Sequence, residues 1–303
     1  MRKIFSIVFA LVLFLITYSE LSAMKDKDSS WNWVDDEFYK TFKQKINRYL
    51  EIEKPYLEFN WGLSQPSINE KVFDGNFEII YEGDFRLGYQ SEQKNEYDLT
   101  ILDYSNNYFF IGHTASNLIG KKEIKNDVIE ARAWKIGFMS SDGYGYRISE
   151  QVGLLFYHSL GLQWTKVDFL NIDATRLSQV DAVETYSDYF HFGEQWESGI
   201  KLKLFDFLSI NGNYERQVIY PRHMFWYWSL SKMIEGVANG LLDSFTRSVM
   251  KSSPWALPIV NIILKSGLSY GIYELKKNKM NWPFETVSPL MYENFKVGIS
   301  LNF

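Results

Sequence analysis

Few residues of this sequence have the types and spacing that catalysis or metal binding requires. Cysteine is absent and only four histidines occur, which excludes thiol chemistry and cysteine-ligated metal sites. No histidine has a metal-ligand spacing, and no glycine-rich phosphate loop is present. We therefore predict no cofactor and no metal. One pair could perform acid–base chemistry: His113 and Ser116, a base and a nucleophile three residues apart.

The segment His113-Thr114-Ala115-Ser116-Asn117 is similar to the His-x-Ser-Asn stretch of outer-membrane lipid A deacylases, in which the two residues share one face of a strand. One extra residue separates them here, so a regular strand would place His113 and Ser116 on opposite faces, and a bulge or loop would be needed to join them. His113 and Ser116 are therefore the catalytic candidates. The alternative interpretation is a polar strand end that enters a loop.

A larger set of charged residues alternates with apolar ones. Leu57, Phe59, Trp61 and Leu63 lie on one face of a predicted strand and polar residues on the other, a period of two that is typical of strands. The pattern recurs and predicts eight strands, at 55–64, 76–90, 104–114, 128–139, 152–165, 194–205, 207–220 and 289–303. The segment 266–275 also alternates, so the count extends to ten or twelve. His158 and Arg132 fall on the apolar face, at a membrane interface or in a register wrong by one residue.

The last predicted strand ends in alternating apolar residues that close on the terminal Phe303. It resembles the C-terminal strand of Gram-negative outer-membrane β-barrels, which the barrel assembly machinery recognises. The residues of this assembly signal are Phe295, Val297, Ile299, Leu301 and Phe303. The resemblance implies an all-β fold, a transmembrane antiparallel barrel with apolar residues toward lipid and polar ones toward the lumen. A soluble β-sandwich is the alternative.

The barrel interpretation gives the alternating charges a common location. We predict a polar lumen cluster of Glu78, Glu82, Asp84, Arg86, Glu197, Lys201, Lys203 and Glu215. In a barrel of eight strands such charges pair and fill the interior, whereas ten or twelve strands would leave room for a polar pathway or ligand pocket.

The first 23 residues have the features of a cleaved secretory signal peptide. Arg2 and Lys3 precede an uncharged apolar run, and small residues end at Ala23. Residues 24–53 form the next segment, a periplasmic one with an amphipathic helix. Residues 54–303 form the barrel. With the N-terminus periplasmic, the short turn at 205–207 faces the periplasm and the long segment 167–190 faces outward.

The region 222–277 departs from the strand pattern. Leu230, Met233, Ile234, Val237, Leu241, Phe245 and Val249 form an apolar stripe at helical spacing, which Ser252, Ser253 and Pro254 interrupt. We predict a helical insertion before the last strand. It could plug the lumen, cap the barrel or lie on the membrane.

The predicted function is that of a bacterial outer-membrane barrel with a structural or partner-binding role. Outer-membrane lipid and the assembly machinery are predicted partners; the sequence names no protein or small-molecule ligand. The formal net charge of −5 argues against nucleic acid. The first alternative is a lipid-modifying enzyme, a deacylase or acyltransferase, and the second is a small pore.

Overall fold

The computed structural model describes residues 54–303 except 70, 117 and 119–127. The predicted signal peptide and the helical segment 24–53 lie outside the described residues.

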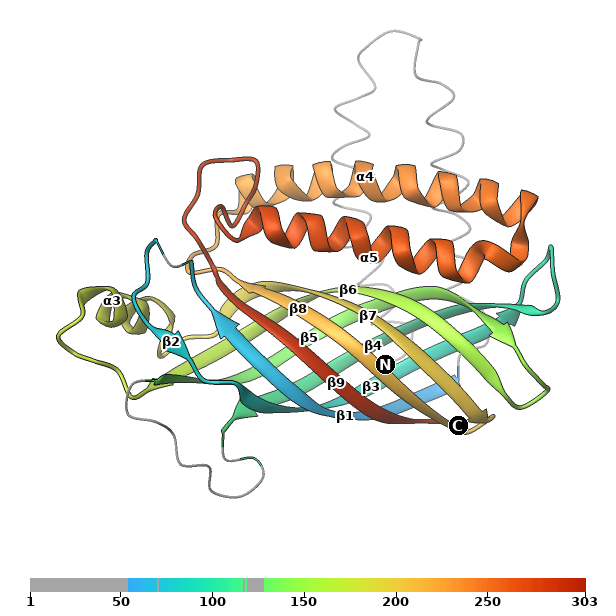
Figure 1. Cartoon of the computed structure of the whole chain (residues 1–303), viewed down its shortest axis with the longest axis horizontal. Helices are drawn as coiled ribbons and strands as arrows, with labels where there is room; N and C mark the ends of the chain where they lie inside the picture. Colours follow the sequence, from blue (N-terminus) through green and yellow to red (C-terminus); the bar gives the residue numbers. More distant parts are fainter. Residues whose placement is uncertain (1–53, 70, 117, 119–127) are drawn as a thin grey trace, which may run out of the picture. The chain divides into compact units, whose positions relative to one another are not determined.

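Eight long antiparallel strands form a closed barrel (Figure 1). They are β1 (Lys54–Ser67), β3 (Ile80–Lys94), β4 (Ile101–Ala115), β5 (Val128–Arg147), β6 (Gly153–Leu170), β7 (His191–Phe205), β8 (Leu208–Ile219) and β9 (Leu290–Asn302). Each pairs with its neighbour along the chain, and β9 closes the sheet by pairing with β1. The short strand β2 (Asn76–Phe77) pairs with the start of β5.

The register determines how wide the barrel is. Crossing the pairs from Leu57 through all eight strands returns to β1 at Ser67, a stagger of 67 − 57 = 10 residues. With eight strands, the interior has room for side chains and little else.

The eight predicted strands are all present, which confirms the fold class, although several differ in extent from the prediction. β5 continues eight residues past its predicted end, because glycines there let neighbouring strands approach: a Cβ on Gly143 would lie 2.0 Å from the carbonyl oxygen of Phe156. The segment 266–275 is helical, so the option of ten or more strands is wrong.

The two ends of the barrel differ. At one, which we call the short-turn end, the strands are joined by 95–100, 148–152 and 206–207. The tight hairpin predicted at 205–207 is thus confirmed. The other, the long-loop end, carries 68–79, 116–127, 171–190 and the large insertion before β9. Helix α3 (Leu177–Tyr186), which the sequence pattern did not indicate, lies in the third of these. The first described residue and the C-terminus are both at the short-turn end.

The insertion is a helical hairpin. Helix α4 (Phe225–Ser252) ends at the predicted break, a 3-10 turn η1 (Pro254–Ala256) follows, and α5 (Leu257–Lys276) returns. Both helices run along the barrel, and α5 contacts β5, β6, β7 and β8 (Figure 1). The hairpin therefore packs against the outer wall, an arrangement that differs from plugging the lumen or capping the barrel.

Candidate functional site

The lumen is filled by an ionic network. Alternate residues of every strand point inward, and among them are five carboxylates and four cations that are almost fully buried. The carboxylates are Glu58, Glu82, Asp84, Glu197 and Glu215; the cations are Arg86, Lys135, Lys201 and Lys296. A buried charge is tolerated only when it is paired and hydrogen-bonded, so these groups can remain ionised only as a connected set.

Arg86 lies at the centre of this network. Its guanidinium contacts Asp84 at 2.8 Å, Glu197 at 2.5 Å and Glu58 at 3.1 Å. It also donates a hydrogen bond to the hydroxyl of Tyr108. Because Glu197 belongs to β7 and Arg86 to β3, this contact crosses the lumen and ties opposite walls together.

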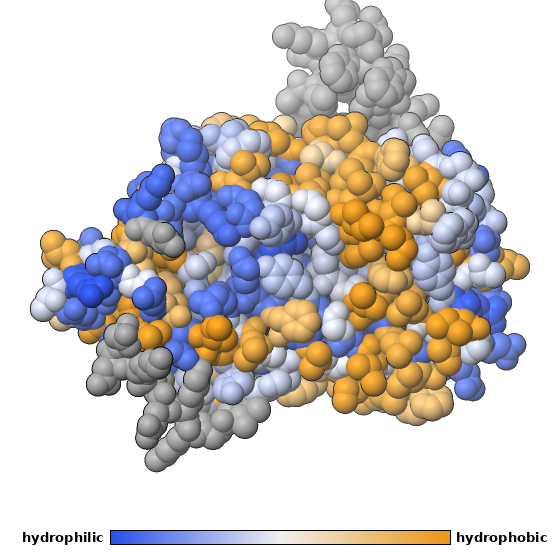
Figure 2. Space-filling view, viewed as in Figure 1, coloured by the Kyte–Doolittle hydropathy of each residue, from blue (hydrophilic) through white to orange (hydrophobic). Residues whose placement is uncertain are grey.

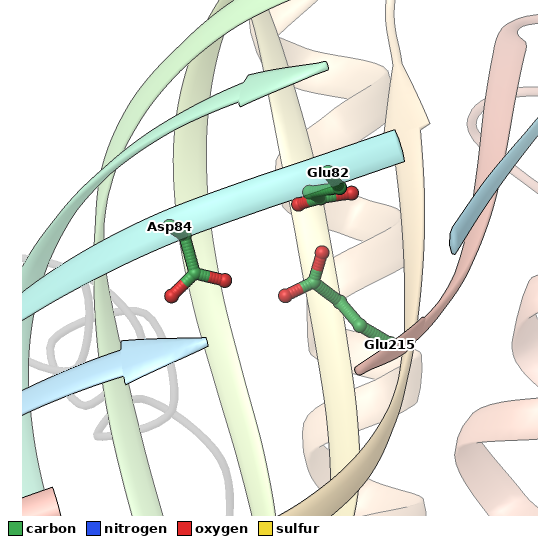
Figure 3. Close-up of side chains that lie close together, drawn as sticks. All are labelled: Glu82, Asp84 and Glu215. Carbon is green, nitrogen blue, oxygen red and sulfur yellow. The ribbon is translucent and has the colours of Figure 1, made fainter. Parts of the chain in front are cut away.

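Three carboxylates converge beside it: Glu82 and Asp84 from β3 and Glu215 from β8 (Figure 3). Such a group could in principle hold a metal ion. Here the ammonium of Lys296 lies 2.6 Å from Asp84 and 2.6 Å from Glu215, and Lys135 lies 2.9 Å from Glu82. The lysines thus provide the positive charge that these carboxylates require.

Lys201 is held by aromatic rings on the other side of the network. Its ammonium lies 4.6 Å from the ring centre of Tyr56, 5.4 Å from that of Tyr104 and 5.8 Å from that of Tyr157, and 3.3 Å from Glu58. A cation over several ring faces is stabilised by the ring quadrupoles.

Apolar side chains close the lumen toward the long-loop end. They are Ala131, Ala133, Val167, Ile219, Leu290 and Tyr292, all buried in one cluster. The ionic network and this apolar layer together fill much of the lumen with buried side chains.

Two residues of the predicted lumen cluster lie outside the central ionic network. Glu78 precedes β3, in the segment that follows β2, and is only partly buried. Lys203 lies at the short-turn end, where it pairs with Glu92 at 3.0 Å and Asp206 at 3.1 Å. The hydrogen bond and charge of Lys203 hold the pKa of the Asp206 carboxyl below its ordinary value. The other six are in the network.

A second polar site lies on the outer wall, beneath the helical hairpin. Five successive residues of β7, Gly193–Glu197, are buried, because the lumen covers one face of the strand and the helices cover the other. The carboxylate of Glu194 forms salt bridges with Lys232 of α4 at 2.8 Å and with Lys276 of α5 at 2.7 Å. Both lysines also pair with Glu235. We call this contact between the hairpin and the wall the polar seam.

The polar seam continues toward the short-turn end. Lys265 of α5 pairs with Asp142 of β5 and with Asp243 of α4. His158 of β6 is bonded to Ser198 of β7 at 3.1 Å, and Ser198 to Ser266 of α5 at 2.8 Å. These contacts explain why His158 stands on the apolar face of its strand: the register is as predicted, and α5 covers the imidazole.

Arg216 of β8 is only partly hydrogen-bonded within the polar seam. It is 1% exposed, donates a hydrogen bond to Ser269 at 2.8 Å and lies near the rings of Tyr214, Tyr270 and Tyr273. Its Nε and Nη1 have no hydrogen-bond partner in the described part of the chain.

Arg132, which was predicted together with His158 to lie on an apolar face, is near the long-loop end and pairs with Glu130 at 2.7 Å.

The catalytic candidates have separate partners. The imidazole of His113 bonds to the carbonyl of Ala133 at 3.0 Å and stacks on Trp134, with ring centres 4.2 Å apart. The amide of Ser116 donates to Glu130 at 2.8 Å. No hydrogen bond between His113 and Ser116 is present among the described residues, and a catalytic role for the pair stays a prediction.

The residues of the predicted assembly signal are on β9, or directly after it in the case of Phe303. Phe295, Val297 and Ile299 are each more than half exposed on the outer wall, and Phe303 ends the chain.

No model of a known protein family matches the chain, and no curated protein matches it. Among solved structures, Neisserial surface protein A is 9% identical, over 82% of this chain and 97% of that one, with a TM-score of 0.35. Ail, the attachment invasion locus protein of Yersinia pestis, is 6% identical over 84% of this chain and 100% of that one, with a TM-score of 0.30. Both are outer-membrane β-barrel proteins. The closed antiparallel barrel of this chain rests on its own strand register, described above.

Proposed function

We propose that this protein is an integral β-barrel of the bacterial outer membrane. It does not form an ion-conducting pore, and it binds a partner through its long-loop end. The observation that carries the proposal is the reversed polarity of the barrel. Charged side chains are buried in the lumen, while large apolar residues are exposed on the wall. A soluble protein would bury the apolar residues, whereas a barrel in lipid exposes them.

The exposed apolar residues form a belt. They include Phe59, Leu63, Phe85, Leu87, Phe109, Ile111, Trp134, Leu160, Trp164, Ile200, Ile210, Phe295, Val297 and Ile299, contributed by all eight strands. In Figure 2 apolar surface covers much of the visible wall and of the hairpin, and hydrophilic residues gather toward the long-loop end and also along the edge of the short-turn end. This distribution supports a lipid-embedded barrel with two water-exposed ends.

The filled lumen favours a binding or structural role over a pore. Ions crossing the barrel would have to displace Arg86 and Lys296 from their carboxylates, and such buried pairs cost several kcal/mol to break.

The long-loop end offers a surface for binding. Leu177, Tyr189 and Phe190 are large apolar residues that lie in 171–190 and are at least half exposed. Exposed apolar groups outside a lipid belt are typical of protein interfaces. We assign partner binding to this end and cell-surface exposure to the same loops, and we take outer-membrane lipid and the assembly machinery as further partners.

The first experiment tests membrane insertion and closure together. The isolated membrane fraction is expected to contain the protein, with a gel mobility that changes on boiling, because a closed barrel keeps its strands paired in detergent until heated. The same protein in a planar bilayer is expected to give no conductance steps. Conductance steps that change size in Glu82→Gln or Lys201→Gln would establish a pore. Recovery of the protein in the soluble fraction, without a mobility shift on boiling, would contradict the membrane location.

The second experiment tests orientation, using the absence of cysteine. Tyr189→Cys places a thiol at the long-loop end and Leu99→Cys places one, similarly exposed, at the short-turn end. In intact cells a membrane-impermeant maleimide is expected to label the first and spare the second, because only an accessible thiolate reacts. The reverse labelling would invert the assigned orientation.

A further inference from the structure

The α4–α5 hairpin is apolar on the side that faces away from the barrel. The exposed apolar residues are Phe225, Trp226, Tyr227, Leu230, Met233, Ile234, Val237, Leu241 and Phe245 of α4, and Ile259, Ile263, Tyr270 and Leu275 of α5. Six of the seven residues of the predicted stripe of α4 are therefore exposed, and Val249 is partly buried. In water this surface would be unfavourable.

The side that faces the barrel combines the apolar residues Leu257, Ile272 and Tyr273 with a row of polar residues. Asn261, Lys265 and Ser269 recur every four residues on α5 and are buried, as are Ser231 and Glu235 on α4. They meet the polar residues of the outer wall in the polar seam. The hairpin thus covers the part of the wall where charges interrupt the apolar belt, and it presents an apolar surface in their place.

The dimensions of the hairpin match a bilayer. At 1.5 Å per residue, the 28 residues of α4 span about 42 Å and the 20 residues of α5 about 30 Å. A bilayer is roughly 30 Å thick in its hydrocarbon core and roughly 40–45 Å with its headgroup regions. The segment Pro254–Lys276 is also long and apolar enough to cross a membrane.

Exposed tryptophans lie at both ends of the hairpin. Trp226 is in the first turn of α4 and Trp255 is in the turn between the helices, 77% and 67% exposed. Tryptophan concentrates at the two membrane–water interfaces, where its ring is half in lipid. One helix length separates these two residues, which is the spacing that two interfaces require.

We propose that the α4–α5 hairpin crosses the outer membrane beside the barrel, with the acyl chains of the bilayer covering its outward face. The inference rests on the proposed membrane location of the barrel, because the same lipid belt continues from the strands onto the helices. Bilayer lipid is the partner of this surface, and the polar seam is the dry interface that holds the hairpin to the wall.

A second copy of the chain is the competing occupant. Gly236 and Gly240 of α4, and Gly267 and Gly271 of α5, are spaced four apart, and a Cβ at each would meet open space. Small residues at this spacing allow helices to pack closely in membranes. The test therefore separates lipid from a second copy.

Single-cysteine variants carrying a nitroxide spin label provide the measurement. Val237→Cys and Ile263→Cys report the outward faces of α4 and α5, Val297→Cys reports the barrel belt and Glu150→Cys reports the short-turn end. In phosphatidylcholine vesicles, labels at 237 and 263 are expected to match 297, accessible to oxygen and at least ~10-fold less accessible to a water-soluble nickel chelate than the label at 150, since charged solutes are excluded from hydrocarbon.

The outcomes are distinguishable. If 237 and 263 contact the nickel chelate while 297 does not, the hairpin is outside the bilayer and the inference fails, although the membrane barrel stands. If 237 is shielded from both reagents and shows spin–spin broadening between chains, a second copy covers the face and the inference also fails. If 297 itself contacts the nickel chelate, the proposed function fails together with the inference.

Discussion

Replacing Lys296 by methionine is expected to lower the free energy of unfolding of the barrel by about 3–5 kcal/mol, the range for removing one partner of a buried ion pair. The ammonium lies 2.6 Å from both Asp84 and Glu215 in the lumen. Methionine keeps the length of the side chain and removes its charge, so five carboxylates would remain with three cations. The measurement is denaturant unfolding in detergent micelles, followed by tryptophan fluorescence.

The matched control is Lys203→Met. This lysine also pairs with carboxylates, Glu92 and Asp206, but it lies at the short-turn end near water. Its loss is expected to cost less than about 1 kcal/mol. Adding Glu215→Gln to Lys296→Met should recover part of the stability, because four carboxylates would again exceed the cations by one. Equal effects of Lys296→Met and Lys203→Met would show that burial of the network contributes nothing.

Glu194→Gln is expected to weaken the attachment of the helical hairpin to the wall by a similar amount, about 3–5 kcal/mol. Glu194 is buried and is shared by Lys232 and Lys276, so its neutralisation leaves two ammonium groups with Glu235 alone. In a low-dielectric seam the imbalance favours separation of the helices from the strands. The expected readout is faster protease cleavage at 220–224, with the barrel still heat-modifiable.

Glu274→Gln is the control for this prediction. Glu274 also pairs with a lysine, Lys277, but both side chains are more than one third exposed. Little change in cleavage is expected, since exposed pairs contribute at most about 1 kcal/mol. Combining Glu194→Gln with Lys276→Met should restore part of the attachment. Cleavage of Glu194→Gln at the rate of the unmodified chain would mean that packing alone holds the hairpin.

The barrel could be predicted from local patterns because its two faces meet different surroundings. Phe85 and Leu87 on one face of β3, with Asp84 and Arg86 on the other, identify a strand between lipid and a polar interior. The partners across the lumen could not be predicted, since Arg86 and Glu197 meet only through the stagger of the closed sheet.

The position of the helical hairpin could not be predicted from local sequence patterns. The apolar stripe of α4 indicated a surface that must meet lipid or protein, and each option remained open. Two signals pointed to the wall: the polar residues Asn261, Lys265 and Ser269 at helical spacing on α5, and the charges Glu194 and Arg216 on outward positions of strands. Each set is polar where its own helix or strand face is otherwise apolar. The two sets become complementary only when the helix and the strands are in contact.

The last strand has a consequence for how the barrel comes into being. Lys296 lies on β9, the strand that closes the sheet between β8 and β1, while the carboxylates it neutralises are on β3 and β8. Until β9 has paired, Asp84 and Glu215 lack this ammonium. Closure of the sheet and completion of the charge balance of its interior are therefore one event.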